Sequence, residues 1–401
     1  MPGATVPQTA MMPAYNQQQP GYPMPMYQQV PARSAQAASM KRILLFIILV
    51  PLVLFFLIII IKALTSSGGG DTPATPPPPP VVTSTTTKPT QPPTTPTKPT
   101  TPTKPATSTT TTTTDPNQGN NVPPPPAGNY QNDDYTVPDP NFSPPELPMP
   151  ETYQDAADWM ITNAFYDQNI PVPVRCTIPN IDPSTASKSE LETYLNDATA
   201  CLMRVWGPAL EAAGYNASRP SVTVYSGQIQ SACGKMPNEN ALYCSADQQV
   251  YYATDLPDLF PEQMHDPLVP IAVIAHEFGH AIQAQTGILY SEIAWQQYFT
   301  DQGDDATANQ MSRRVEMQAD CFAGSFFQSI TQSVGITPDN QDVVAQVFFS
   351  IGDDQLTGDP NFDGDHGMGV NRRDWFGAGL VATAASTCNT FADAVTDDQV
   401  R

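Results

Sequence analysis

Two histidines four residues apart, His276 and His280, form the strongest chemical signal in this sequence, with Glu277 directly after the first. On a helix, residues with this spacing lie on one face, about one turn apart. Two imidazoles so placed can bind one zinc ion, and the glutamate between them then lies beside the water on the metal. Because so short a pattern also arises by chance in ordinary buried helices, the metal interpretation requires a third ligand.

Glu316 is the candidate third ligand, and Asp320 follows it four residues later. A histidine six residues after His280 is the other common solution, but Thr286 stands there. Glu316 would complete a set of two histidines and one carboxylate that leaves a position for water. Asp320 would accept the free N–H of a ligand histidine and fix its ring. The alternative for this stretch is a solvated helix face on which Glu316 pairs with Arg313.

Hydrolysis is the chemistry that this set of residues predicts. Zinc lowers the pKa of its water, and Glu277 accepts the proton as the water attacks a carbonyl carbon. The resulting oxyanion needs a stabiliser besides zinc, and His366 or Arg372 could supply it. For His366 the alternative is a loop residue in a turn rich in Gly and Asp.

The segment Asp359–Asp365 matches the first half of a calcium-binding loop, with acidic or amide residues at positions one, three and five and Gly364 at six. Position twelve, where a bidentate glutamate belongs, is Val370. We therefore interpret the segment as a polar turn, with calcium binding as the alternative.

The elements that must position these residues are expected to be mostly helices. Helical patterns cover residues 153–167, 188–213, 271–282, 306–333, 341–350 and 371–394. Short β patterns cover residues 221–225, 241–244 and 249–254. The predicted fold class is α+β, mostly α, with a small antiparallel sheet.

The chain divides by composition into four parts. We expect a disordered Pro/Gln-rich tail (1–40), a transmembrane helix (43–61), a Thr/Pro-rich extracytoplasmic linker (65–150) and one folded domain (151–401). The apolar run would form a helix of roughly 28 Å, enough to cross a bilayer core. A cleaved signal peptide is the alternative, but its apolar core is normally shorter and closer to the N-terminus.

Basic residues flank the apolar run unevenly. Arg33, Lys41 and Arg42 precede it and only Lys62 follows closely, which favours a cytoplasmic N-terminus and an extracytoplasmic C-terminal domain. We therefore expect a single-pass protein of the cell membrane whose domain can reach the cell wall.

Negative charge is concentrated in the folded part. Residues 1–146 carry 7 Lys and Arg against 6 Asp and Glu, whereas the remaining residues carry 10 against 33. So acidic a domain is not expected to bind nucleic acid or anionic lipid head groups.

All six cysteines lie in the folded part, which fits disulfides in an oxidising compartment. Cys233 and Cys244 flank a turn between β patterns and are expected to pair across a hairpin. Cys176 precedes the helix expected over 188–213 and Cys201 lies within it, so these two cysteines are expected to form the next disulfide. Cys321 then remains for Cys388, which would join the Glu316 helix to the C-terminal helix. A reduced, buried Cys321 is the alternative.

The sequence resembles the putative neutral zinc metallopeptidase family of bacteria. The resemblance rests on blocks in one order, which are Ser231–Gly234, Tyr243–Cys244, Gln249–Tyr251, His276–His280, Glu316–Gly324, Ile351–Asp354 and His366–Gly367 followed by Arg372 and Trp375–Phe376. Between the late histidine and arginine the chain departs from the family, since it has Met368–Asn371 in place of small polar residues and a glutamine. The N-terminal anchor and linker lie outside the family pattern and look like the surface-display segments of Gram-positive envelope proteins.

The resemblance implies a zincin-like metallopeptidase domain that binds Zn²⁺ and acts on a peptide or protein substrate. Two alternatives stay open. One is a zinc amidase or other hydrolase that acts on cell-wall components. The other is a non-catalytic surface module with a structural zinc site, which would have no need of a base at Glu277.

Overall fold

The computed structural model describes residues 126–179, 181–261 and 264–401. The expected N-terminal tail (1–40), the transmembrane helix (43–61) and most of the linker (65–150) lie outside these residues. Among the described helices, none combines the length and the apolar character needed to cross a bilayer.

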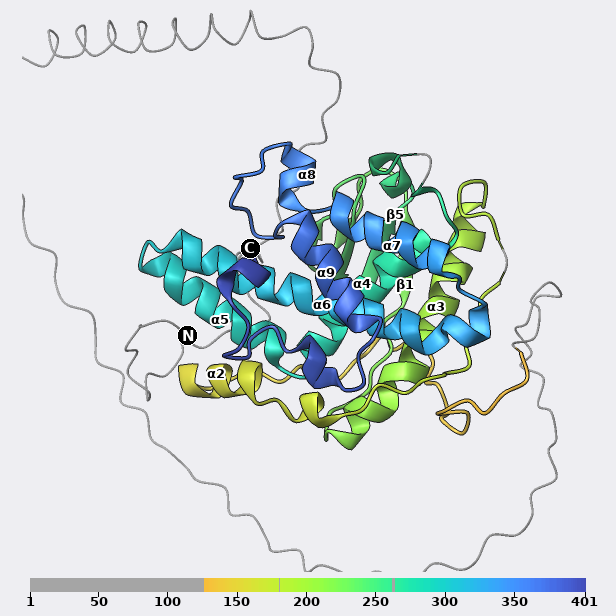
Figure 1. Cartoon of the computed structure of the whole chain (residues 1–401), viewed down its shortest axis with the longest axis horizontal. Coiled ribbons are helices and arrows are strands. Elements are labelled where there is room, and N and C mark those ends of the chain that lie inside the picture. Colours follow the sequence, from red (N-terminus) through yellow and green to blue (C-terminus); the bar gives the residue numbers. More distant parts are fainter. Residues whose placement is uncertain (1–125, 180, 262–263) are drawn as a thin grey trace, which may run out of the picture. The chain divides into compact units, whose positions relative to one another are not determined.

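The described residues are mostly helical, with a small sheet, as expected (Figure 1). The α-helices are α2 (Tyr153–Ile161), α3 (Lys188–Ala212), α4 (Leu268–Gln285), α5 (Ile288–Asp301), α6 (Asp305–Val334), α7 (Pro338–Ser350), α8 (Asp353–Thr357) and α9 (Gly369–Gly379). Short 3-10 turns are η1 (Ala164–Asp167), η2 (Leu256–Leu259), η4 (Ala385–Cys388) and η5 (Asp397–Gln399).

Side-chain caps fix the starts of two helices that matter for the site. Ser187 accepts a hydrogen bond from the backbone N–H of Glu190, whose side chain returns one to the backbone of Ser187, so α3 begins with a capping box. Asp304 accepts from the N–H of Thr307 at the start of α6, the helix that carries the candidate metal carboxylate.

The strands form two small sheets within the described residues. A three-stranded sheet has the order β1 (Val222–Tyr225), β5 (Gln249–Ala253) and β4 (Ala241–Cys244), and β2 (Gln230–Ser231) pairs with β3 (Gly234–Lys235). In the register of the larger sheet, Val222 lies opposite Val250 and Cys244 lies opposite Gln249.

The expectation of an antiparallel sheet is wrong in one respect, because β1 runs parallel to β5. A short turn joins β4 to β5, which forces an antiparallel pair. The chain between β1 and β5 is longer and includes the β2–β3 hairpin. It can therefore lead back to the end of the sheet at which β1 begins, so that β5 runs in the same direction as β1. The sheet is therefore mixed, and β4 is one of its edge strands.

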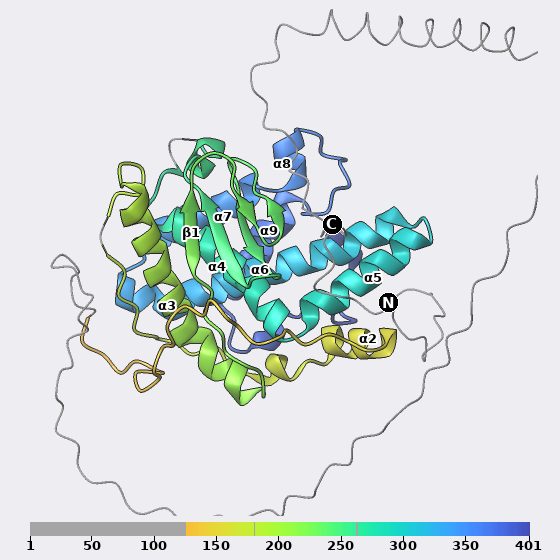
Figure 2. The same ribbon diagram turned by 180° about the vertical axis from the view of Figure 1, so that it is seen from behind.

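Helix α4 lies between the sheet and the helices α6, α7 and α9 (Figures 1 and 2). One face of the sheet joins the main apolar core through residues such as Val224 and Tyr252, both almost fully buried. Ile274 and Phe278 of α4 lie in the same core. The apolar residues of the histidine-bearing helix thus pack against both the sheet and the neighbouring helices.

The helical pattern differs from expectation in several places. The helix expected over 153–167 ends at Ile161 and is followed by η1, and α8 was not expected. Helix α5 was not expected, because its run of mixed aromatic and polar residues has weak helical periodicity, and it is stabilised by packing on α2 through pairs such as Tyr153 with Trp295. The helix expected over 371–394 ends at Gly379, after which the chain continues into η4.

The folded domain also starts earlier than residue 151. Tyr130 and Leu147 are buried, and the backbone N–H of Asn141 donates to the carbonyl of Arg219. Residues 126–150, expected to be linker, therefore lie along the domain and contribute to it. Their proline content concealed the few apolar side chains that anchor them.

All three expected disulfides are confirmed, namely Cys176–Cys201, Cys233–Cys244 and Cys321–Cys388. The structural reasons differ for two of them. Cys233 lies in the turn of the β2–β3 hairpin and Cys244 ends β4, so this bridge joins two sheets. Cys388 lies in η4, so the third bridge ties α6 to a 3-10 turn and not to a C-terminal helix.

Candidate metal centre and its surroundings

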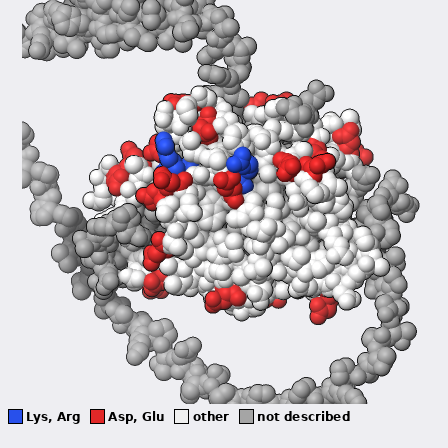
Figure 3. All heavy atoms as spheres, viewed as in Figure 1, with Lys and Arg blue, Asp and Glu red and all other residues white. Residues whose placement is uncertain are grey.

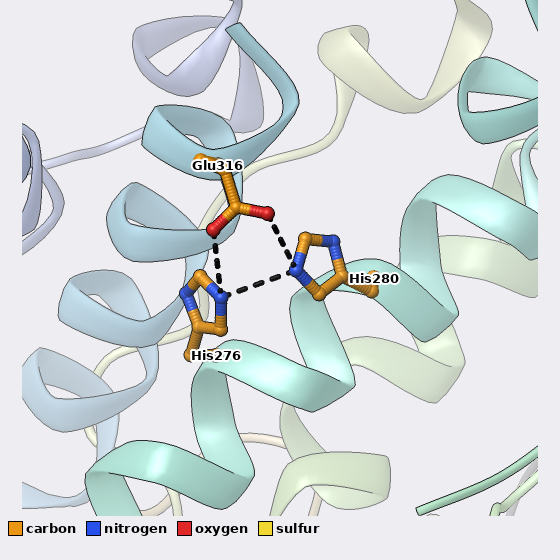
Figure 4. A group of neighbouring side chains, drawn as sticks. All are labelled: His276, His280 and Glu316. Carbon is orange, nitrogen blue, oxygen red and sulfur yellow. Dashed lines mark hydrogen bonds and ion pairs between the residues drawn. The ribbon is translucent and has the colours of Figure 1, made fainter. Parts of the chain in front are cut away.

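Three donor side chains converge where α4 meets α6 (Figure 4). The Nε2 atoms of His276 and His280 are 3.1 Å apart, and they lie 3.3 and 3.4 Å from the carboxylate oxygens of Glu316. Ligands held at 2.0–2.1 Å around a tetrahedral zinc ion are separated from one another by about 3.3 Å. These three residues therefore have the spacing of donors to one metal ion.

Hydrogen bonds to the other ring nitrogens orient both imidazoles. Nδ1 of His276 lies 2.7 Å from Oδ1 of Asp320, the contact that the sequence led us to expect. Nδ1 of His280 lies 2.8 Å from Oε1 of Gln283. The amide nitrogen of Gln283 donates to the carbonyl of Val315, so its oxygen faces the imidazole. With Nδ1–H committed on each ring, both Nε2 atoms are turned toward Glu316.

The electrostatics of this cluster favour a cation. Burial alone would lower the pKa of His276, but Asp320 and then Glu316 raise it to about 9. Burial alone would raise the pKa of Glu316, yet His280 and His276 hold it well below its usual range. A buried carboxylate facing two imidazoles is thus stabilised by positive charge, which a zinc ion would supply in place of a proton. The donor set fits zinc.

A close approach of the two helices brings the donors together. A Cβ atom on Gly279 would lie 2.8 Å from Cα and 2.9 Å from Cβ of Ala319. Any side chain at Gly279 would therefore push α4 away from α6 and separate the histidines from Glu316. The glycine inside the histidine motif has this packing role.

Glu277 lies on the same helix as the histidines and is 7% exposed. Its Oε2 accepts a hydrogen bond of 2.7 Å from the backbone N–H of Tyr243 in β4. That contact fixes the carboxylate against the edge strand, on the helix that carries the two histidines. A carboxylate held there can accept a proton from a water that occupies the remaining metal position.

Arg372 of α9 binds the carboxylates of the centre. Its Nε and Nη2 donate to Oδ2 and Oδ1 of Asp320, both at 2.9 Å, and Nη2 lies 3.3 Å from Oε2 of Glu316. The residue is only 2% exposed. Nε and Nη2 thus face the two carboxylates, and the side chain is almost fully buried.

His366 lies in the loop before α9, where two carboxylates hold it. Its Nδ1 is 3.0 Å from Oδ1 of Asp365 and 3.5 Å from Oδ1 of Asp353. Burial would lower the pKa of His366, but Asp353, Asp365 and Glu316 raise it to about 10. The side chain is 23% exposed, so a positively charged imidazolium can be reached from outside.

Two acidic residues of the loop Asp359–Asp365 make the contacts of a polar turn. Asp359 accepts from the backbone N–H of Asn361, and Asp363 pairs with Arg313. Among the described residues, the groups of potential metal ligands are the zinc donors and a cluster of Asp353, Asp365 and His366, so Asp359 and Asp363 belong to neither. The interpretation as a polar turn is supported.

Three residues of this region were not expected from the sequence. Gln283 orients His280. The sequence could have indicated this contact, because Gln283 follows His280 by three residues on the same helical face. Asp353 accepts the backbone N–H groups of His366 and Gly367, a contact between distant segments that no local pattern indicates. Glu292 of α5 is a buried acid whose Oε1 has no hydrogen-bond partner among the described residues.

One family model matches the chain, and the similar proteins found are uncharacterized. The family model described as "Putative neutral zinc metallopeptidase" matches residues 174–391, more than half of the chain. The uncharacterized protein Rv2575 of Mycobacterium tuberculosis is 32% identical over 210 residues, which cover 47% of this chain and 67% of the relative. The uncharacterized protein YpfJ of Escherichia coli is 29% identical over 237 residues, which cover 56% of this chain and 79% of the relative. No solved structure gives a significant match.

Proposed function

Because the chain belongs to the neutral zinc metallopeptidase family, we propose that it is a zinc-dependent peptidase in which Glu277 is the general base. His276, His280 and Glu316 would hold the metal. When bound, zinc lowers the pKa of water toward neutrality and polarises a carbonyl group. The observation that carries the proposal is the convergence of these three donors beside a buried glutamate that is not itself one of them.

Residues of the chain carry out the proton transfer and stabilise the oxyanion. Glu277 accepts a proton from the attacking water, while the N–H of Tyr243 keeps its carboxylate in place. The oxyanion that forms on the substrate requires a positive or hydrogen-bonding partner. We assign this role to His366, because Asp353 and Asp365 favour its charged form and its side chain is partly exposed.

The test is peptide hydrolysis by the zinc-loaded full-length protein and by its Glu277→Gln variant. We expect the variant to retain its zinc and to lose at least roughly a hundredfold in kcat, since a positioned base contributes about 10²–10⁴-fold. Glu239→Gln, at a turn outside the metal centre, serves as the control. Equal rates in the wild type and Glu277→Gln would reject the role of Glu277.

A parallel assay with cell-wall fragments as substrates distinguishes the proposed peptidase from the alternative, a zinc amidase. Hydrolysis of wall amides without cleavage of a broad peptide library would replace the proposed substrate class. A protein that binds zinc stoichiometrically but is inert on both substrate sets would support the non-catalytic alternative.

We also propose that the domain works outside the cytoplasm, anchored by residues 43–61. Three disulfides within the described residues support this location, since such bridges persist in oxidising compartments. The acidic surface, visible in Figure 3, makes nucleic acid an unfavourable partner. Protease treatment of intact, wall-stripped cells should remove the domain, and protection of the domain would contradict the topology.

A further inference from the structure

Arg372 makes contacts that the proposed reaction does not use. Like His276, it contacts both Asp320 and Glu316, but unlike the histidine it is not one of the metal donors. These carboxylates are four residues apart on one face of α6, and both are at most 2% exposed. Two buried negative charges so close to each other need a shared cation in addition to the metal.

The contacts form a chain that ends at a metal donor. Arg372 holds both oxygens of Asp320, and Oδ1 of Asp320 in turn accepts from Nδ1 of His276. A bidentate guanidinium fixes the plane of a carboxylate, which a single point charge does not. The direction in which Oδ1 faces the imidazole is thus set in part by a residue of α9.

Packing of α9 on α6 places the guanidinium. A Cβ atom on Gly324 would collide with the carbonyl oxygen of Phe376, and one on Gly379 would collide with that of Cys321. The two backbones therefore approach too closely along this contact for any side chain at Gly324 or Gly379. Arg372 lies two helical turns before Gly379, on the same face, which directs it to Asp320, one turn before Gly324.

We propose that Arg372 is a positioning residue that sets the zinc affinity of the centre, by holding Glu316 and the Asp320–His276 pair in their metal-binding orientation. The inference rests on the zinc centre of the proposed function but not on its substrate. Arg372 touches neither the metal position nor a substrate, so its effect passes through the two carboxylates.

The experiment measures zinc affinity of the full-length protein by competition with a chelator, in the wild type and in Arg372→Lys. Lysine keeps the charge but cannot hold both oxygens of Asp320. We expect affinity to fall roughly 10–100-fold, as when the outer partners of metal ligands are removed. The visible spectrum of the cobalt-loaded protein should also change, because it reports the arrangement of the donors.

Arg314→Lys is the matched control. Arg314 is also a buried arginine, two residues before Glu316, but it donates to the backbone carbonyls of Thr390 and Val395. Its replacement should lower thermal stability while zinc affinity stays within about twofold. A general loosening of α6 would instead weaken zinc binding equally in both variants, and that result would overturn the proposal.

A second comparison keeps the proposal testable if Arg372→Lys folds poorly. In an Asp320→Asn background, adding Arg372→Gln should reduce zinc affinity less than Arg372→Gln does alone, because the pathway through Asp320 is already broken. Full additivity of the two losses, or wild-type affinity and cobalt spectrum in either Arg372 variant, would refute the positioning role. A wild-type protein without bound zinc would instead refute the ligand set itself.

Discussion

Oδ1 of Asp320 lies 2.7 Å from Nδ1 of His276 across the contact between α6 and α4. The hydrogen bond fixes the ring so that Nε2 faces Glu316. Replacing Asp320 by Ala should therefore reduce zinc affinity about tenfold and lower activity, with part of the metal retained, because an orienting group does not itself bind the ion. Metal titration and peptide turnover check this, and wild-type values for both would reject the orienting role.

Glu316→Gln should weaken zinc binding by roughly tenfold or more, since a neutral amide is a poor zinc ligand. Glu292→Gln provides a control, because Glu292 is equally buried on the neighbouring helix but is not among the three donors. Competition with a chelator should show reduced zinc affinity for Glu316→Gln and unchanged zinc affinity for Glu292→Gln. Equal affinity in Glu316→Gln and the wild type would remove Glu316 from the centre.

The stability of the metal-free protein should depend on Glu292. Burial, and then the charges of Glu316 and Asp365, raise the pKa of Glu292 to about 8 in the folded state, compared with 4.5 for the free side chain. Between these values the unfolded chain has lost a proton that the folded chain keeps. A rise in pH therefore favours unfolding, by about 1.4 kcal/mol per pH unit within this window.

Glu292→Gln removes this dependence, so the variant should be more stable than the wild type at pH 8 and similar to it below pH 4.5. Thermal unfolding of both proteins after chelation, at several pH values, measures the difference. A difference in stability that stays constant from pH 4.5 to 8 would contradict the raised pKa.

Local periodicity was sufficient to predict the two metal-site helices and the contact of Asp320 with a histidine. Residues four apart on one helix share a face whatever the tertiary structure, so the donors on each helix could be recognised. Gly279 lies between the two histidines of the motif. Its role in the close packing of α4 on α6 could not be predicted, because the sequence does not show that Ala319 lies against it.

Contacts between distant elements could not be predicted in the same way. The binding of Arg372 to Asp320 depends on the close packing of α9 on α6, and the parallel pairing of β1 with β5 depends on the path of a long connection. The expectation that Arg372 or His366 could stabilise an oxyanion therefore did not anticipate the contacts of Arg372 with Asp320 and Glu316.

The disulfides should contribute unequally to stability. Cys321–Cys388 closes 67 residues and Cys233–Cys244 closes 11. On the chain-entropy estimate their removal costs about 4 and about 3 kcal/mol, respectively. Double Cys→Ala variants compared by thermal unfolding should show the larger loss for the first pair, with weaker zinc binding as well, since Cys321 directly follows Asp320. A larger loss for Cys233–Cys244 would contradict this order.

The zinc centre itself is tested most directly by anomalous diffraction at the zinc edge from crystals of the zinc-loaded protein. We expect one strong peak per chain, about 2.0–2.2 Å from Nε2 of His276, Nε2 of His280 and a carboxylate oxygen of Glu316. A peak among Asp353, Asp365 and His366 with none at the two-histidine position, or no peak at all, would contradict the assignment.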